Sequence, residues 1–456
     1  MSRKLSFIPE DDSSEIVKRY EACLSNNNVS GYFDVEELES IVDYYLRKGR
    51  TRESSKALDF GFRLHPNSTG LMTKRAKIYI ATGETKKALQ LLDSQGETGD
   101  YETNLLKIEA LAKLERNKEA HLMCEKLIAA ESTDQDNVCL DIAYVFLHQF
   151  NFETAFKYLK IGEDFDPKNE DLLFELAFCY EHLQNNDEAI NTYNKIIRFD
   201  PYAAEAWFNL GQIYFSQLDF QSALNAYDYA ATIQPEDSLT CLQKAHTHFQ
   251  LQQYEEAIES YFNYEKMAAE NWQTYLFIAE SYERLELFSM AIEFYRKSLA
   301  ENKDNFEALT GIGVCLMEEE QFNESIEYFR DALTMNPTAV DAWVYLAEAL
   351  TGIDDTQGAL LSYLKSIEIE PEQPDTLMAI ANICMEQGEF ALALQYYIEA
   401  NRQDNDHELE YIHLFMAVAY YKLGATDASA ASLSNAVAEN LDALKLFLEL
   451  CPEANE

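Results

Sequence analysis

The chain has 456 residues and a formal net charge of −44, with 80 acidic against 36 basic side chains. Binding to nucleic acid requires Lys and Arg opposite the phosphates, and anionic membranes attract basic segments, so this balance argues against both kinds of partner. Only 15 glycines and 9 prolines interrupt the chain, which indicates a helical protein. The excess of acid lies almost wholly after residue 126, because residues 1–126 hold 20 basic and 21 acidic side chains and the remainder holds 16 and 59.

The amino-terminal segment predicts a capping helix over residues 13–24. Residues 12–14 offer the short polar side chains that cap a helix. The apolar residues at helical spacing are Ile16, Val17, Tyr20 and Leu24. We assign residues 1–34 to this cap.

The amino-terminal sequence, the apolar segments and the cysteines indicate the cellular compartment. The apolar stretch at residues 5–8 is too short for a signal peptide, and no segment reaches 18 apolar residues. None of the eight cysteines forms a C-x-x-C pair, which is typical of small core side chains in a reducing compartment. We expect a cytoplasmic protein.

Residues 35–135 predict three divergent, charge-balanced helix-turn-helix units. They begin at Val35, Thr69 and about Tyr101. The second unit is shortened near residues 95–99, and the third has only a weak pattern.

From residue 136 onward the chain becomes regular. Six of the nine prolines mark unit ends, and these are Pro66, Pro167, Pro201, Pro235, Pro337 and Pro371. The last five are separated by 34 residues or by three times 34, whereas Pro66 precedes Pro167 by 101 residues. A proline stops a helix, and a 34-residue period is typical of a helix-turn-helix solenoid. Eight units follow one another without insertion over residues 136–407, and they carry most of the acidic charge.

Residues 408–456 predict one last unit and a capping helix. An insertion near residues 404–410 precedes the unit, which contains Ala417, Tyr420 and Ala436 in phase. The helix predicted over residues 441–450 is apolar nearly all round. It either caps the array or provides a surface for self-association.

The unit that begins at Ala204 resembles the tetratricopeptide repeat (TPR). Its matching residues, at unit positions 4, 7, 8, 11, 20, 24, 27 and 32, are Trp207, Leu210, Gly211, Tyr214, Ala223, Tyr227, Ala230 and Pro235. The large residues form a helical stripe, and the small ones let two helices approach closely. The resemblance, which covers about residues 35–440, implies an all-α, right-handed superhelical solenoid of about twelve units with a capping helix at each end.

The resemblance also implies a concave groove lined by the first helix of each unit, chiefly at positions 2, 5, 9 and 12. Positions 5, 9 and 12 share one helix face by their spacing alone. We expect the partner-binding groove to contain Tyr144, Phe174, Phe178, Phe208, Gln212, Leu242, His246, Phe249, Glu280, Glu283, Val314, Glu348 and Asn382. The alternative is that these residues only pack neighbouring helices together.

The groove residues indicate the chemistry of a partner. Some TPR domains bind acidic chaperone tails through Lys and Asn at these positions, yet positions 5, 9 and 12 of the eight regular units contain no Lys or Arg. An apolar, possibly basic segment fits better.

The sequence gives no support for catalysis or for the binding of a cofactor or metal. It contains none of the phosphate-loop, dinucleotide, zinc-protease or serine-hydrolase motifs. His246 and His248 point apart on a helix, and Asp404, Asp406 and Glu408 lack the glycine of a calcium loop. We expect no enzyme, cofactor or metal, but a scaffold that binds a protein or peptide. The alternatives are a component that self-associates through residues 441–450 as a homo-oligomer, or through the charge-balanced residues 1–126 docking onto the acidic remainder.

Overall fold

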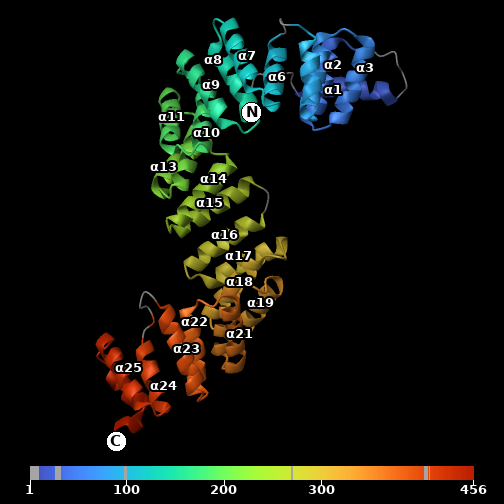
Figure 1. Cartoon of the computed structure of the whole chain (residues 1–456). Helices are drawn as coiled ribbons and strands as arrows, with labels where there is room; N and C mark the ends of the chain where they lie inside the picture. Colours follow the sequence, from blue (N-terminus) through green and yellow to red (C-terminus); the bar gives the residue numbers. More distant parts are fainter. Residues whose placement is uncertain are drawn as a thin grey trace. The chain divides into compact units, whose positions relative to one another are not determined.

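The computed structural model describes residues 10–25, 32–96, 100–268, 271–404, 409 and 411–455. It divides into two compact units, Met1–Ile233 and Gln234–Glu456, and the division along the chain falls between two repeats. The described residues contain 26 α-helices and no strand, and each unit is a stack of antiparallel helical hairpins (Figure 1). The chain is therefore an all-α solenoid, as its repeats predict.

The first unit holds a leading helix and six hairpins. Its helices are α1 (Glu10–Ser25), α2 (Val35–Arg47), α3 (Thr51–Leu64), α4 (Thr69–Ala81), α5 (Thr85–Asp93), α6 (Tyr101–Lys113), α7 (Asn117–Ala130), α8 (Gln135–Leu147), α9 (Phe152–Phe165), α10 (Glu170–His182), α11 (Asn186–Phe199), α12 (Ala204–Ser216) and α13 (Phe220–Ile233). Consecutive helices pair into hairpins, the first being α2 with α3 and the last α12 with α13.

The second unit holds six more hairpins and a final helix. Its helices are α14 (Ser238–Gln250), α15 (Tyr254–Met267), α16 (Trp272–Arg284), α17 (Phe288–Glu301), α18 (Phe306–Glu318), α19 (Phe322–Met335), α20 (Val340–Gly352), α21 (Thr356–Ile369), α22 (Pro374–Glu386), α23 (Phe390–Gln403), α24 (Ile412–Lys422), α25 (Thr426–Glu439) and α26 (Ala443–Leu450), followed by the 3₁₀ turn η1 (Pro452–Asn455). Twelve hairpins between two capping helices confirm the predicted number of repeats.

The prolines end hairpins as predicted. Pro66, Pro167, Pro201, Pro235, Pro337 and Pro371 each lie two residues beyond the last residue of a second helix. In several repeats, a short polar side chain then caps the first helix of the next hairpin. The Asn169 side chain, for example, accepts a hydrogen bond from Leu172 N at 3.1 Å and so caps α10.

The turn within each described hairpin contains one residue in the left-handed region. These residues are Gly49, Gly83, Glu115, Phe150, Gln184, Leu218, Gln252, Glu286, Glu320, Asp354, Gly388 and Gly424. At Leu218, where φ is 62°, the backbone N–H donates to Phe215 O and that of Asp219 to Tyr214 O, both at 3.0 Å. Such bonds satisfy carbonyls at the helix end and fix the turn.

Large side chains of the second helices pack onto small residues of the first. A Cβ added to Gly211 would lie 2.6 Å from Tyr227 Cε1, and one added to Gly313 would lie 2.5 Å from Phe329 Cε1. Both distances are shorter than a carbon–carbon contact allows. The small-against-large packing inferred from the sequence is therefore confirmed in both units.

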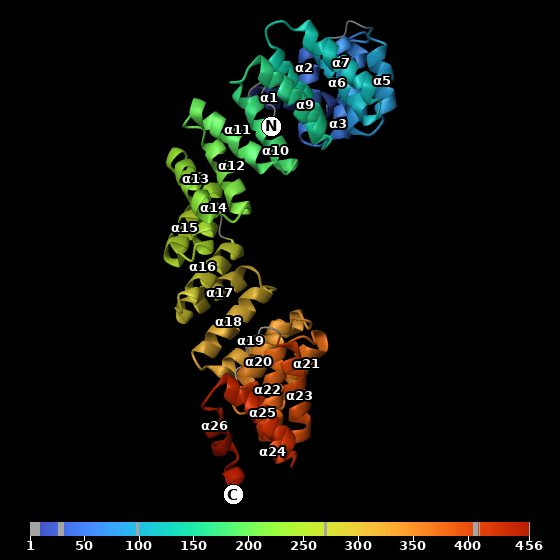
Figure 2. The ribbon, with the colours of Figure 1, turned by 60° about the vertical axis from the view of Figure 1, so that its left-hand side comes forward.

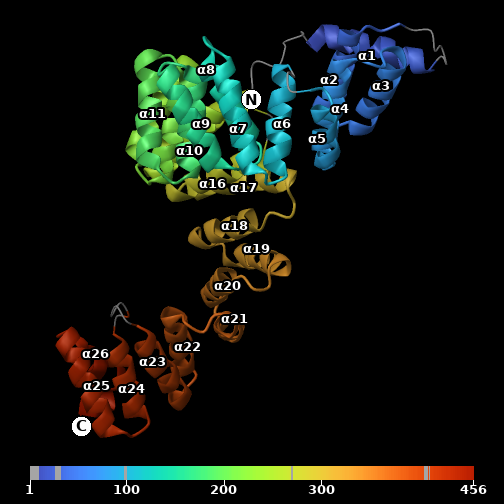
Figure 3. The same cartoon turned by 45° about the horizontal axis from the view of Figure 1, so that its top comes forward.

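The two end helices cover the terminal hairpins. Val17 and Tyr20 of α1 are buried against α2 and α3 (Figure 3), and the helix begins at Glu10, three residues before its predicted start. Ala443 and Phe447 of α26 are buried against α24 and α25 (Figure 2), and this helix begins two residues after its predicted start. The predicted start of α1 left out the acidic residues 10–12, and the predicted start of α26 included Leu441 and Asp442, so the ends of both helices were misplaced by two or three residues.

Candidate interaction surface

The predicted groove residues fall into two sets, one in each compact unit, and all lie on first helices. We use the name first-helix face for the surface formed by unit positions 5, 9 and 12 within a compact unit. In the first unit, α8, α10 and α12 carry Tyr144, Phe174, Phe178, Phe208 and Gln212. Phe178 and Gln212 are exposed, and the other three are half-buried.

The second unit holds the other eight predicted residues. They are Leu242, His246 and Phe249 on α14, Glu280 and Glu283 on α16, Val314 on α18, Glu348 on α20 and Asn382 on α22. Glu348 is exposed and the rest are half-buried. Their role in binding stays a prediction.

Three of these polar residues bind tyrosines of their own hairpins. The Tyr261 hydroxyl lies 2.8 Å from His246 Nδ1, the Tyr295 hydroxyl donates to Glu283 Oε2 at 2.6 Å, and the Tyr397 hydroxyl donates to Asn382 Oδ1 at 2.5 Å. Each tyrosine occupies unit position 24 and is buried. The side chains of the three groove residues therefore form bonds within their own hairpins. Packing was the alternative that the sequence left open for the groove residues, but the tyrosine partner on the second helix was not predicted.

The acidic part of the second unit contains a perturbed carboxyl group. Burial, reinforced by the neighbouring Glu283, raises the pKa of Glu280 to about 7, while Arg284 acts in the opposite direction. Burial and then Glu318 raise the pKa of Glu348 as well. Glu280 is therefore partly protonated at neutral pH, which weakens its attraction for a cation.

An exposed aromatic cluster includes Phe178, which lies on the first-helix face of the first unit. The Phe152 and His182 rings are stacked with centroids 4.1 Å apart, and Phe178 meets His182 edge-on at 4.4 Å. Phe178 is 41% exposed, and the adjoining Phe150 is 81% exposed in a left-handed turn. We call Phe150, Phe152, Phe178 and His182 the aromatic cluster. Only Phe178 was predicted, since the others lie outside unit positions 5, 9 and 12.

A cavity of about 640 Å³ lies beside this cluster, between α6, α8, α10 and α12. Seven carboxylates line it, including those of Asp141, Glu175 and Glu205. Tyr101, Tyr144 and Phe174 contribute aromatic walls, and the described residues that line the cavity include no Lys or Arg. Tyr144 and Phe174 were predicted site residues, whereas the sequence did not show that these acids converge.

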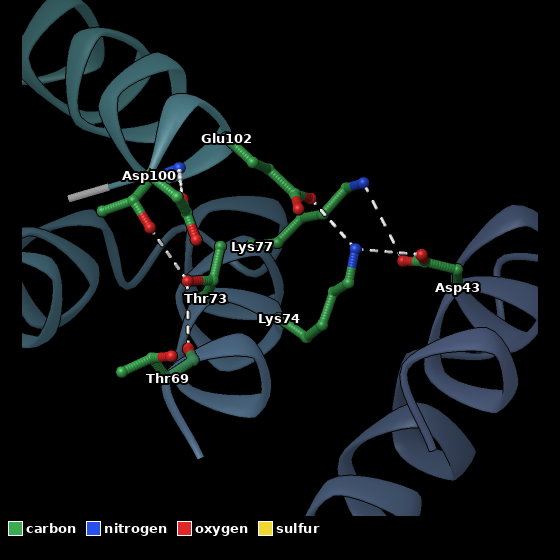
Figure 4. Close-up of polar contacts among 8 residues, drawn as sticks. Asp43, Thr69, Thr73, Lys74, Lys77, Asp100 and Glu102 are labelled. Atoms are coloured by element: carbon green, nitrogen blue, oxygen red, sulfur yellow. Dashed lines mark hydrogen bonds and ion pairs between the residues drawn. The ribbon is translucent and has the colours of Figure 1, made fainter. Parts of the chain in front are cut away.

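In the first three hairpins, carboxylates on the first helices are paired with a lysine of the chain. Lys74, on α4, is 6% exposed, and its Nζ lies 3.0 Å from Asp43 on α2 and 3.0 Å from Glu102 on α6 (Figure 4). Burial disfavours this ammonium group, yet the two carboxylates hold the pKa of Lys74 above its usual value. The ammonium group of Lys74 therefore links α2, α4 and α6, the first helices of three consecutive hairpins.

Metal-ligand clusters and membrane-spanning helices are both absent from the described part of the structure. Within the residues that it describes, no group of three or more His, Cys, Asp or Glu side chains is placed to hold a metal ion. Asp406 and Glu408 lie outside those residues. No described helix is both long and apolar enough to cross a membrane.

Comparisons with protein families agree with the repeats. The family described as the cilia and flagella-associated protein 70 middle TPR-like domain matches residues 275–440. Tetratricopeptide repeat families match residues 180–218, 204–237 and 242–306, and the family of subunit 3 of the anaphase-promoting complex, cyclosome, matches residues 113–196. No curated protein matches the chain significantly.

Several solved structures are similar to parts of the chain. The C-terminal part of a TPR protein from Cytophaga hutchinsonii is 15% identical, covers 52% of this chain and 98% of its own, and has a TM-score of 0.46. YrrB, a TPR protein with an unusual peptide-binding site, is 20% identical over 41% of this chain and 96% of its own, with a TM-score of 0.36. The Cut9–Hcn1 hetero-tetramer of APC/C is 14% identical over 90% and 93%, with a TM-score of 0.39.

The hairpins, their 34-residue period and the family matches define the class of this protein. It is a tetratricopeptide-repeat protein, and its architecture is that of a protein-interaction scaffold. Scaffolds of this class are in general not enzymes.

Proposed function

We propose that the protein is a non-enzymatic scaffold that binds a protein or peptide segment on its first-helix face, and that the segment carries apolar and basic side chains. The observation that carries this proposal is the exposure of Phe178 within the aromatic cluster. A phenylalanine that is 41% exposed beside two further exposed or half-buried rings is costly in water unless a partner covers it. Aromatic side chains of this kind are common anchors of interfaces.

The basic character of the partner is supported by charge. The described residues lining the cavity beside the aromatic cluster supply carboxylates and no Lys or Arg. Complementary charge speeds association and suppresses wrong partners. A partner with Lys or Arg next to an apolar residue would pair its charge with the carboxylates of the cavity and cover the aromatic cluster with its apolar side chain.

The test is affinity capture from the source cells with three proteins: the wild type, Phe178→Glu and Phe199→Glu. Phe199, on the second helix α11, is 50% exposed and serves as the matched control. We expect proteins that the wild type and the Phe199 variant retain and that the Phe178 variant loses. The same set of proteins from all three baits would contradict binding on this face. Phe208 is a poorer test site because its ring packs against Tyr227 at 5.8 Å.

Self-association through the carboxyl-terminal helix is a second candidate. α26 buries Phe447 but leaves Leu444 and Leu450 each 48% exposed, and the preceding Leu441 is 87% exposed. Sedimentation velocity at several concentrations tests it. A mass that rises with concentration in the wild type and not in Leu444→Glu with Leu450→Glu would support this role, and a constant monomer mass would reject it.

We also propose a cytoplasmic location. The support is that none of the eight cysteines, which all lie among the described residues, forms a disulfide and that six of them are buried. Burial raises the pKa of Cys124 to about 11, so this thiol stays protonated and unreactive. Labelling of thiols in intact cells and in lysates, compared with marker proteins of each compartment, tests the proposal.

A further inference from the structure

The acidic cavity of the first unit lies at repeat positions that include a lysine in an earlier hairpin of the same chain. Lys74 is at position 6 of the unit that begins at Thr69, and Glu102 is at position 2 of the following unit. In the unit that begins at Glu170, position 6 is Glu175, and position 2 of the following unit is Glu205. The lysine of the earlier hairpin is thus replaced by a glutamate, while the glutamate that faces it is retained.

The exchange reverses the local charge balance. Around Lys74, two carboxylates from α2 and α6 share one ammonium group at 3.0 Å each. Glu175 and Glu205 line one cavity together with five further carboxylates and without a described Lys or Arg. Besides burial, the charge of Glu205 raises the pKa of Glu175, and a cation placed between these two carboxylates would relieve their repulsion.

The walls of the cavity suit an organic cation better than a hydrated ion. Tyr101, Tyr144 and Phe174 present aromatic rings, whose faces attract ammonium and guanidinium groups. Burial raises the pKa of Glu175, although a hydrogen bond from the Tyr144 hydroxyl opposes the shift, so this carboxylate is incompletely hydrated. A Lys or Arg side chain would provide charge, hydrogen bonds and apolar contact together.

The aromatic cluster lies next along the same helix. Phe174, Phe178 and His182 are four residues apart on α10 and so lie on one face, with Phe174 in the cavity wall and Phe178 in the cluster. Four helical residues advance about 6 Å, which is the length of about two residues of extended peptide. The two subsites are therefore spaced for a basic side chain and an apolar side chain two residues apart.

We propose that the first-helix face of α8, α10 and α12 binds an extended peptide that inserts one Lys or Arg side chain into the acidic cavity and lays an apolar side chain, two residues away, on Phe178. This proposal rests on the scaffold function proposed above and names the chemistry of its ligand. Lys74, held between Asp43 and Glu102, shows the arrangement that we expect for the ligand cation.

The test begins with selection of a displayed library of random nonapeptides on the full-length protein. We expect enriched sequences with Lys or Arg two residues from a Leu, Ile, Phe or Met. The affinity of an enriched peptide is then measured by fluorescence anisotropy against three proteins. These are the wild type, Glu175→Gln with Glu205→Gln, and the matched control Glu153→Gln with Glu188→Gln, whose substitutions lie on exposed positions of α9 and α11.

The double substitution in the cavity should weaken binding at least about tenfold, whereas the control should keep the wild-type affinity. Changing the basic residue of the peptide to Met should cause a similar loss on the wild type and little further loss on the cavity variant. This second measurement uses an unaltered protein, so it does not depend on the folding of any variant.

Four outcomes would overturn the proposal. Enriched peptides without a basic residue, or equal affinity for the cavity variant and the wild type, would refute the ligand chemistry and leave the scaffold function standing. Binding that appears only after deletion of residues 1–9 would assign the cavity to the chain's own Arg3 and Lys4. A library that yields no binding peptide at all would overturn the scaffold function as well.

Discussion

The Tyr295 hydroxyl donates a hydrogen bond to Glu283 Oε2 at 2.6 Å across the hairpin of α16 and α17. Tyr227 occupies the same position of its own repeat, yet its buried hydroxyl has no partner among the described residues. We expect Tyr295→Phe to lower the free energy of unfolding by about 1–2 kcal/mol, because it removes a bond to a charged group. Tyr227→Phe should change it little or raise it. Urea denaturation of both variants checks this, and equal losses would contradict it.

The left-handed turn residues offer a second prediction. Leu218 has φ 62° and is 74% exposed, so its side chain gains little from packing while its backbone is strained. Leu218→Gly should raise the free energy of unfolding by about 0.5–1 kcal/mol, since glycine adopts this conformation without steric cost. Glu259→Gly, on the exposed side of α15, is the control and should lose about 1 kcal/mol. Thermal unfolding followed by circular dichroism gives both values, and a loss at Leu218 would refute the argument.

Glu280 predicts a dependence of stability on pH. Its pKa is raised to about 7 in the folded chain, chiefly by burial, so the folded state holds its proton more tightly than the unfolded state does. Its contribution to stability is therefore present below a pH of about 4.5 and is lost as the pH rises toward 7.

Relative to the wild type, Glu280→Gln should gain on the order of 2 kcal/mol at pH 8 and almost nothing at pH 4.5. Denaturation of the two proteins at several pH values measures this difference. Glu301→Gln, an exposed substitution on the neighbouring α17, should show no such trend. A difference that stays constant with pH would show that Glu280 titrates as an ordinary exposed carboxyl group.

The buried ammonium group of Lys74 predicts a compensating pair of substitutions. Lys74→Met removes the cation that Asp43 and Glu102 share, although Lys77 Nζ stays 3.9 Å from Asp43 Oδ1. Because both carboxylates are partly exposed, we expect a loss of about 1–3 kcal/mol. Adding Asp43→Asn should restore part of the stability, because one of the two repelling charges disappears. Chemical denaturation of the single and double variants tests the coupling, and additive losses would argue against it.

Much of the fold follows from residues that act locally. Prolines two residues past six of the twelve second helices, and small residues opposite large ones, specify hairpins where they recur. The prolines act by stopping the helix, and the small residues act through close packing within one repeat. Twelve hairpins and both capping helices were predictable for this reason. The starts of the capping helices were not, since helix ends fray and residue type alone does not fix the first helical residue.

The candidate site was only partly predictable. The face of each first helix follows from its period, which is why Phe174 and Phe178 were identified. The role of a polar residue on that face depends on its neighbour across the hairpin, as the tyrosines that hold His246, Glu283 and Asn382 show. Sequence spacing does not reveal whether such a side chain faces a partner or a hydroxyl of its own chain.

The sequence by itself determined the class of the protein, its repeat boundaries and its acidic surplus, because these depend on spacing and composition alone. Only the tertiary structure decided that Glu175 and Glu205 share a cavity with aromatic walls while Lys74 is neutralised between two carboxylates. The physical reason is that charges interact through space over a few ångströms, and residues about 30 positions apart come that close only when successive hairpins stack.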